Sequence, residues 1–116
     1  MSAALQDGSF VAGINLLPLK FRAHRAGDMR LNVHVATTGP EPGNWLIAVQ
    51  HGICRVFMGS IMCPDARLYT SSDTGTDILS GSLPVEEAVT RQLLHLDGDP
   101  DALRRFAACF QLGGAS

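Results

Sequence analysis

The histidines of this sequence are few and far apart. It contains four histidines, and no two of them stand at the HxH or HxxxH spacing that places two imidazoles on one metal ion. They are His24, His34, His51 and His95. His34 falls on the polar phase of an alternating segment and His51 falls in a turn. We therefore expect exposed or hydrogen-bonded imidazoles and no metal site.

Three cysteines, Cys54, Cys63 and Cys109, offer no better site. Their odd number and the absence of a CxxC pair argue against a disulfide framework and against zinc. Cys54 stands inside an apolar run, where a thiol has a raised pKa and low reactivity. Cys63 precedes Pro64 in an expected loop, with no neighbouring His or Lys in the sequence to activate it. We expect reduced, mostly buried thiols and no catalytic cysteine.

The carboxylates form no acid–base pair and no calcium loop. Asp97, Asp99 and Asp101 alternate as calcium ligands do, but the later Glu of such a loop is missing, and helix capping explains Asp99 and Asp101. Glu86 and Glu87 are adjacent and point in different directions on a helix. Glycine-rich phosphate motifs are absent. The sequence predicts no catalytic residue, no metal and no cofactor, and favours a protein that is not an enzyme.

Composition places the chain among globular, single-domain proteins. Its 116 residues are 46% hydrophobic and 17% charged, with a formal net charge of −2. The lack of a basic excess argues against nucleic acid as a partner. The N-terminus has no signal-peptide pattern, and no apolar run reaches the roughly 18 residues of a membrane span, so we expect a cytoplasmic protein.

One local cluster of basic residues stands out near the N-terminus. It consists of Lys20, Arg22, His24, Arg25 and Arg30. It is either an ordinary solvated surface or a patch that makes transient contact with the anionic head groups of a membrane.

The elements that would position these side chains follow from periodicity. Residues 1–30 form an N-terminal helical segment: Phe10, Ile14 and Leu17 recur at helical spacing, and Pro18 divides the segment into short helices. Residues 31–71 alternate as four strands, at about 31–37, 45–50, 53–58 and 65–71, which we interpret as an antiparallel meander. The two residues His51-Gly52 predict a tight hairpin between the second and third strands.

The last third of the chain, residues 72–112, is predicted to be helical with a short fifth strand near residues 95–97. Ser72 or Asp73 is expected to cap one helix that ends near Gly81, and Pro84 begins another. Asp99 is an N-cap followed by proline at the first helical position. The stripe behind it consists of Leu103, Phe106, Ala107 and Phe110, and Gly113-Gly114 is expected to end the helix.

This order of elements resembles the sterol carrier protein 2 (SCP2-like) domain family. The stretches that carry the resemblance are "NWLIAVQHGICRVFMG", "PDARLYTSSDTGTDILSG" and "LLHLDGDPDALRRF". The positions that match the family pattern in order are Gly52, Pro64, Asp65, Ala66, Leu68, Ser71, Gly81, Gly98 and Asp99. The C-terminal Gly-Gly-Ala-Ser lacks the peroxisomal Ser-Lys-Leu address, which favours a bacterial stand-alone member.

The resemblance implies an α/β (α+β) fold: a five-stranded, mostly antiparallel sheet covered on one face by helices, with an apolar tunnel between sheet and C-terminal helix. The candidate lining residues are Val33, Val35, Ile47, Val49, Val56, Met58, Leu68, Leu103, Phe106 and Phe110. Ordinary core packing explains each of these residues equally simply.

Three functions remain open at this point. The first is non-enzymatic binding, or transfer, of a lipid or other hydrophobic small molecule in that tunnel. The second is an accessory or interaction module with a filled core, including a homodimer through an open strand edge or apolar face. The third is a pathway-specific biosynthetic enzyme or helper on the same fold.

Overall fold

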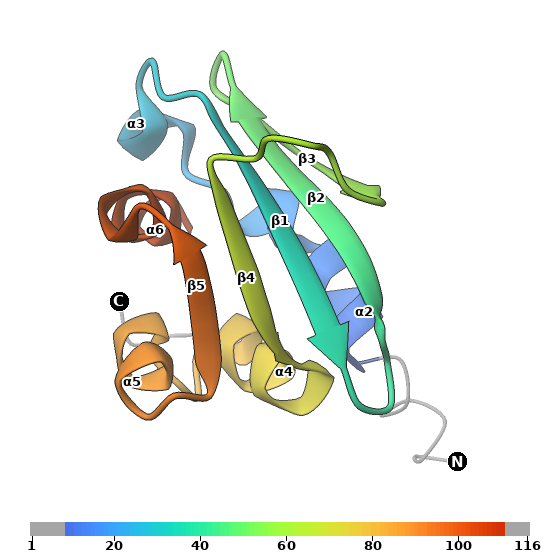
Figure 1. Ribbon diagram of the computed structural model, residues 1–116. Helices are drawn as coiled ribbons and strands as arrows, with labels where there is room; N and C mark the ends of the chain where they lie inside the picture. The colour runs from blue at the N-terminus through green and yellow to red at the C-terminus, as the bar shows by residue number, and fades with distance from the viewer. Residues whose placement is uncertain (1–8, 111–116) are drawn as a thin grey trace.

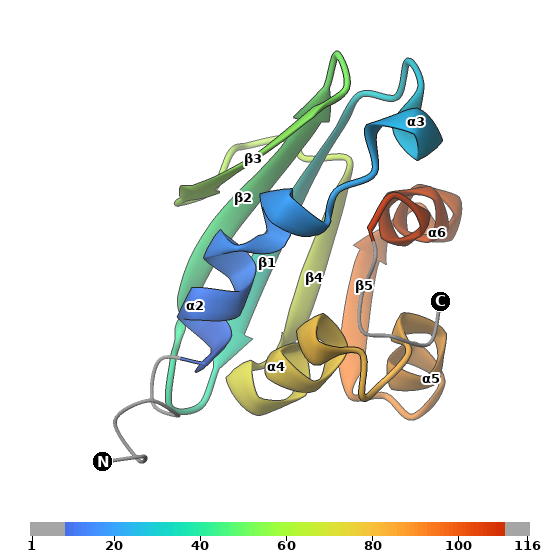
Figure 2. The ribbon, with the colours of Figure 1, turned by 180° about the vertical axis from the view of Figure 1, so that it is seen from behind.

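The computed structural model of this chain describes residues 9–110. Five strands form one sheet in the order β3-β2-β1-β4-β5, and the helices gather on one of its faces, here called the inner face (Figures 1 and 2). The strands are β1 (Leu31–Thr38), β2 (Gly43–Gln50), β3 (Ile53–Met58), β4 (Ala66–Ser71) and β5 (Leu94–Gly98). The helices are α2 (Ser9–Asn15), η1 (Leu17–Lys20), α3 (Ala23–Ala26), α4 (Ser72–Ser80), α5 (Val85–Thr90) and α6 (Pro100–Ala108). The predicted fold class is confirmed.

The hairpin between β2 and β3 forms where the sequence predicts it. His51 has a φ of 53° and Gly52 a φ of 71°. Two successive residues with positive φ make the tight turn whose twist matches that of the flanking strands. The alternation along β2 is confirmed as well, because Trp45, Ile47 and Val49 are buried on the inner face.

The extension of the meander to residue 71 is wrong. β4 does not pair with β3; it pairs in parallel with β1, in a register that includes Val33 with Ala66 and Val35 with Leu68. The chain from β3 therefore crosses the outer face of the sheet to reach β4, and Arg67 Nη2 donates to the Met62 carbonyl oxygen of that crossover at 3.0 Å. Periodicity identifies a strand but does not specify its neighbour, and here β4 covers the second edge of the most buried strand.

The N-terminal segment divides near Pro18, as predicted, and α2 is held at its N-terminal end. The Glu41 carboxylate, in the β1–β2 turn, accepts from the backbone N–H groups of Phe10 and Val11, each at 3.1 Å. The Phe10 ring packs edge-on against Trp45, with centroids 5.0 Å apart. These contacts seat α2 on the β1–β2 end of the inner face.

The C-terminal elements also follow their local signals, with one correction. α4 is capped by Ser71, whose hydroxyl accepts from the Thr74 N–H at 3.1 Å, and not by Ser72 or Asp73. The same hydroxyl donates to Thr74 Oγ1 at 3.0 Å. Gly81 ends α4 with a φ of 86°.

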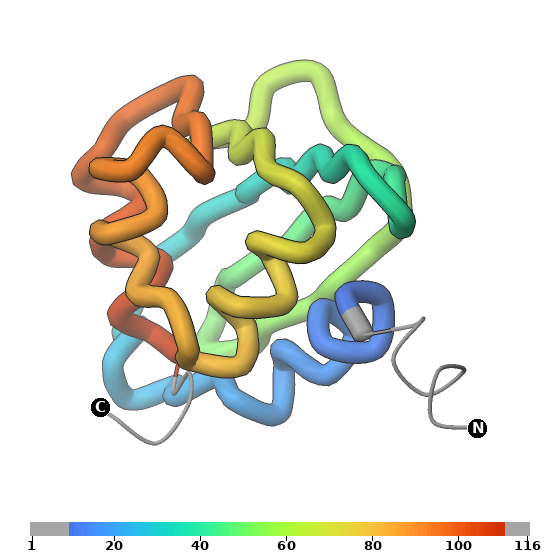
Figure 3. The backbone as a smooth tube through the Cα atoms, turned by 90° about the horizontal axis from the view of Figure 1, so that it is seen from below, coloured from blue at the N-terminus to red at the C-terminus, as the bar shows by residue number. Residues whose placement is uncertain are grey.

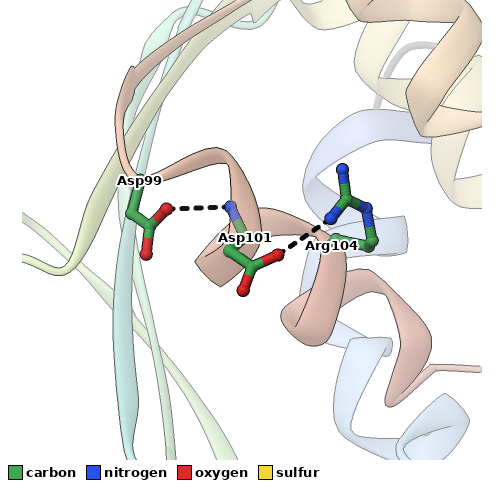
Figure 4. Close-up of polar contacts among 3 residues, drawn as sticks. All are labelled: Asp99, Asp101 and Arg104. Carbon is green, nitrogen blue, oxygen red and sulfur yellow. Dashed lines mark hydrogen bonds and ion pairs between the residues drawn. The ribbon is translucent and has the colours of Figure 1, made fainter.

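The cap of α6 is confirmed. The Asp99 carboxylate accepts from the Asp101 N–H at 3.0 Å (Figure 4), and Pro100 opens the helix. α6 stops at Ala108, so Phe110 lies beyond it, paired by an isolated bridge with Phe21. The predicted stop at Gly113-Gly114 lies outside the described residues.

The anchoring of α2 yields a first prediction. Glu41→Ala should lower the free energy of unfolding by about 1–2 kcal/mol, because two N–H groups in the first turn of α2 lose their acceptor. Urea unfolding measures the difference. The control is Glu87→Ala, which removes an exposed ion pair with Arg91 and should cost less than about 0.5 kcal/mol. Equal costs for the two variants would contradict the anchoring role of Glu41.

Candidate functional site

An apolar cavity of about 80 Å³ lies between the inner face of the sheet and the helices. The sheet contributes its floor, α2 and η1 form one wall, and α4, α5 and α6 form the others. The lining residues are Phe10, Ile14, Leu17, Val35, Ile47, Leu68, Thr70, Gly75, Ile78, Leu79, Val85, Leu94, Leu103, Phe106, Ala107 and Phe110. We call this space the inner cavity.

The wall formed by α2 depends on a close approach between two helices. A Cβ atom on Gly75, in α4, would lie 2.4 Å from Cε1 of Phe10. Because glycine has no Cβ, the Phe10 ring can lie against α4 while its other side contacts Trp45. Phe10 is 2% exposed, so the α2 side of the inner cavity is closed by a fixed aromatic ring.

The opposite wall is built around two more aromatic rings. Phe106 of α6 packs edge-on against Phe110 with centroids 5.0 Å apart, and Phe110 packs against Phe21 at 5.6 Å. The backbone N–H of Arg22 donates to the Cys109 carbonyl at 2.7 Å. The end of α6 is therefore attached to the segment that follows η1 (Figure 3).

The polarity of the inner cavity limits what it could hold. Its one polar side chain is Thr70, whose hydroxyl donates to the Leu93 carbonyl oxygen at 2.8 Å. This leaves no free charged group or hydrogen-bond donor among the lining side chains. The inner cavity can accept hydrocarbon, and it offers no chemistry to a reacting group.

A larger groove of about 690 Å³ opens to the surface between α5 and α6. We call it the α5–α6 groove. Five residues line both it and the inner cavity, so these side chains form the partition between the two spaces: Ile78, Val85, Leu103, Ala107 and Phe110. Polar side chains lie along the groove: Glu86, Thr90 and Arg104. Arg104 is held by Asp101 in an exposed ion pair at 2.8 Å (Figure 4).

The structure brings together six of the ten predicted lining residues. These are Val35, Ile47, Leu68, Leu103, Phe106 and Phe110. Val33 and Val49 share the inner face but are packed solidly, at 0% and 1% exposure, and Val56 is half-buried at the margin of the core.

Met58 is the clear error among the ten. It pairs with Trp45 and therefore belongs to the inner face, as predicted, yet its side chain is 84% exposed. The alternation along β3 identifies the face of the sheet, but β3 is the edge strand and its last residue projects beyond the helices.

Most of the lining residues that the prediction missed come from the helices, and two, Thr70 and Leu94, come from β4 and β5. Phe10, Ile14 and Leu17 had a visible signal, the helical spacing of their apolar side chains. Gly75, Ile78 and Leu79 had none that distinguishes a cavity wall from core, because α4 is only partly apolar.

Among the described residues, no cysteine or histidine lines either space. Burial, with a smaller contribution from the neighbouring Cys109 thiol, raises the pKa of Cys54 to about 11. Burial also raises the pKa of Cys109, whose Sγ donates to the Arg105 carbonyl. His34 is buried on the outer face, with Nε2 2.8 Å from Asn44 Oδ1. Within residues 9–110, no group of three or more His, Cys, Asp or Glu side chains is arranged to hold a metal ion.

The predicted basic patch is partly used by the fold. Lys20 Nζ donates to the Leu79 carbonyl at 2.8 Å, and an Arg25 guanidinium N–H lies 3.4 Å from the Ala108 carbonyl oxygen. Both carbonyls belong to the last turn of a helix, where a positive charge is stabilised. Arg22 is half-buried and Arg30 is exposed. None of the described helices is long and apolar enough to cross a membrane.

No family model and no curated protein matches the sequence. Solved structures match the fold. The palmitated SCP2L2 of Aedes aegypti has a TM-score of 0.72 at 14% identity, covering 94% of this chain and 97% of its own. The Aedes aegypti sterol carrier protein 2 in complex with palmitate has a TM-score of 0.59 at 19% identity, covering 82% and 94%.

A third match is a much longer protein. The inverting sec-alkylsulfatase Pisa1 from Pseudomonas sp. has a TM-score of 0.73 at 19% identity, over 87% of this chain. This chain spans 16% of the sulfatase. At these identities the likeness concerns the fold.

The burial of two thiols yields a second prediction. On the folded protein at pH 8, iodoacetamide should modify Cys63, which is exposed, and leave Cys54 and Cys109 unmodified. With a pKa of about 11, about 0.1% of Cys54 is thiolate at pH 8. Intact mass spectrometry counts the adducts, and the protein in guanidinium should take three. A second adduct that forms on the folded protein as fast as the first would contradict the buried positions of Cys54 and Cys109.

The same shift has a consequence for stability. Between pH 9 and about 11 the Cys54 thiol ionises in the unfolded chain and stays protonated in the folded one. The contribution of the buried thiol to the free energy of unfolding is therefore fully present below pH 9, and it is lost as the pH rises towards 11.

Proposed function

We propose that this chain, which has the fold of sterol carrier protein 2 domains, binds a lipid or other elongated hydrophobic molecule and does so without a catalytic step. The observation that carries the proposal is that the two spaces are adjacent. The inner cavity and the α5–α6 groove share a wall of five side chains, all apolar. An apolar chain could lie along the groove and place its end in the inner cavity once that wall moves.

The volumes of the two spaces favour a ligand whose chain end occupies the inner cavity while the rest lies in the groove. A cavity of about 150 Å³ holds a benzene ring, so the inner cavity, at about 80 Å³, suits the end of a hydrocarbon chain and not a whole ligand. The α5–α6 groove, at about 690 Å³, is within the range of about 300–1,000 Å³ typical of small-molecule sites.

The expected affinity is moderate and the expected selectivity is low. A ligand that buries about 300 Å² of apolar surface gains about 7.5 kcal/mol, from which the cost of association is subtracted. No lining side chain of the inner cavity is free to recognise a functional group, so selection would act through shape and through Glu86, Thr90 and Arg104 in the groove. The two mosquito structures with palmitate support an acyl chain as one such ligand.

A second function is favoured by one comparison. The match to this chain covers 16% of Pisa1, so the fold also occurs as part of a longer enzyme. The chain could then act as an accessory module that presents a hydrophobic substrate to a catalytic partner, or as a helper in a biosynthetic pathway. Both roles use the same groove.

The ligand proposal yields a third prediction. Ala107→Phe places a ring in the shared wall and should weaken binding of palmitate at least about tenfold, or about 1.4 kcal/mol. Isothermal titration calorimetry measures the affinity, with a sterol and an isoprenoid quinone as further probes. Ala12→Phe, on the exposed side of α2, is the matched control and should bind as the unchanged protein does.

Two results would contradict the proposal. One is the absence of binding by all three probes together with no rise in melting temperature. The other is equal affinity of Ala107→Phe and Ala12→Phe for palmitate, which would place the ligand elsewhere.

A further inference from the structure

β3 forms one edge of the sheet, and η1 lies beside it. Within the described residues, β3 pairs with β2 on one side and with no strand on the other. Ile53, Phe57 and Met58 are 49%, 47% and 84% exposed. β3 contains no proline and no lysine, the residues that commonly protect an edge, and its one charged residue is Arg55.

The hairpin determines which backbone groups face this open edge. In a two-residue hairpin the closing pair, Gln50 with Ile53, exchanges hydrogen bonds, and every second residue then faces the partner strand. The Gly59 N–H donates to the Asn44 carbonyl at 2.9 Å, in the same phase. The N–H and C=O groups of Cys54, Val56 and Met58 therefore point to the free edge.

The other edge of the sheet is less suited to pairing. β5 has five residues, it carries the exposed acidic side chain of Asp97, and it runs directly into α6 (Figure 1). An acidic side chain on a short edge strand opposes the addition of another strand. Any pairing through a strand edge is thus directed to β3.

We propose that β3 pairs antiparallel with β3 of a second copy of this chain, about a two-fold axis at Val56. In this register Val56 lies opposite Val56 of the second copy and Cys54 lies opposite Met58. All three residues with free backbone groups then form hydrogen-bonded pairs, and the inner faces of the two sheets stay on the same side. The two sheets become one sheet of ten strands.

Charge disfavours the neighbouring register centred on Arg55. A two-fold axis at Arg55 would place two guanidinium groups directly opposite each other, which is destabilising. The axis at Val56 places Arg55 opposite Phe57 of the second copy on the outer face, where guanidinium and ring attract each other. The strand is therefore complementary to itself, which suits a second copy better than an unrelated strand.

The dimer is expected to be weak and independent of ligand binding. Pairing two six-residue edges buries less than about 1,200 Å², which is the range of transient interfaces. The α5–α6 groove lies at the β5 side of the sheet, across from β3, so both grooves of the dimer stay open (Figures 1 and 3).

The fourth prediction concerns the oligomeric state. Sedimentation velocity from 10 µM to 1 mM should show a reversible monomer–dimer equilibrium. Phe57→Lys places a like charge opposite Arg55 and should leave a monomer at all these concentrations. Phe57→Glu removes the same exposed ring but places an opposite charge there. This variant should dimerise at least as strongly as the unchanged protein.

Amide hydrogen exchange tests the register on the unchanged chain. From 20 µM to 1 mM, the N–H groups of Cys54, Val56 and Met58 should gain protection, while those of Ile53, Arg55 and Phe57, already bonded to β2, should not change. A monomer at 1 mM would overturn the proposal. So would a dimer of equal strength in Phe57→Lys and Phe57→Glu, or protection that appears on β5 instead of β3.

Discussion

The inner face of the sheet has to be removed from water, and the elements available to cover it are short. The described helices have between four and nine residues. Val33, Ile47 and Val49 are at most 2% exposed beneath them, so the cover succeeds over the middle of the sheet. Short helices from both parts of the chain nevertheless leave one space unfilled. This space is the inner cavity, which residues of α2, α4 and α6 line together with the sheet.

Because the helices are short, several polar side chains serve to hold them in place. Glu41 receives the first N–H groups of α2, and Lys20 reaches the end of α4. Asp99 caps α6, and Arg25 approaches its last carbonyl. A seven-residue helix such as α2 is unstable alone, so its position depends on these tertiary contacts and on the Phe10 ring. Of the five basic residues that suggest a binding patch in the sequence, two, Lys20 and Arg25, hold the ends of helices.

Binding without catalysis is consistent with this division of roles. Several polar groups hold the scaffold together, and the inner cavity is lined almost entirely by hydrocarbon. The β3 edge belongs to a different part of the molecule, so the proposed association of two copies and the proposed occupation of the α5–α6 groove use separate surfaces.

Local interactions in the sequence determined the elements of this protein, and non-local packing decided the site. Asp99-Pro100 starts α6 and His51-Gly52 closes the hairpin because capping and turn conformation involve residues within a few positions of one another. The alternation of Trp45, Ile47 and Val49 identifies the buried face for the same reason. The pairing of β4 with β1, the exposure of Met58 and the partition at Ala107 depend on residues far apart in the chain. A cavity is a space that none of its lining residues encodes alone, so only the tertiary structure could separate Val35, which borders it, from Val33, which is packed solidly two residues away.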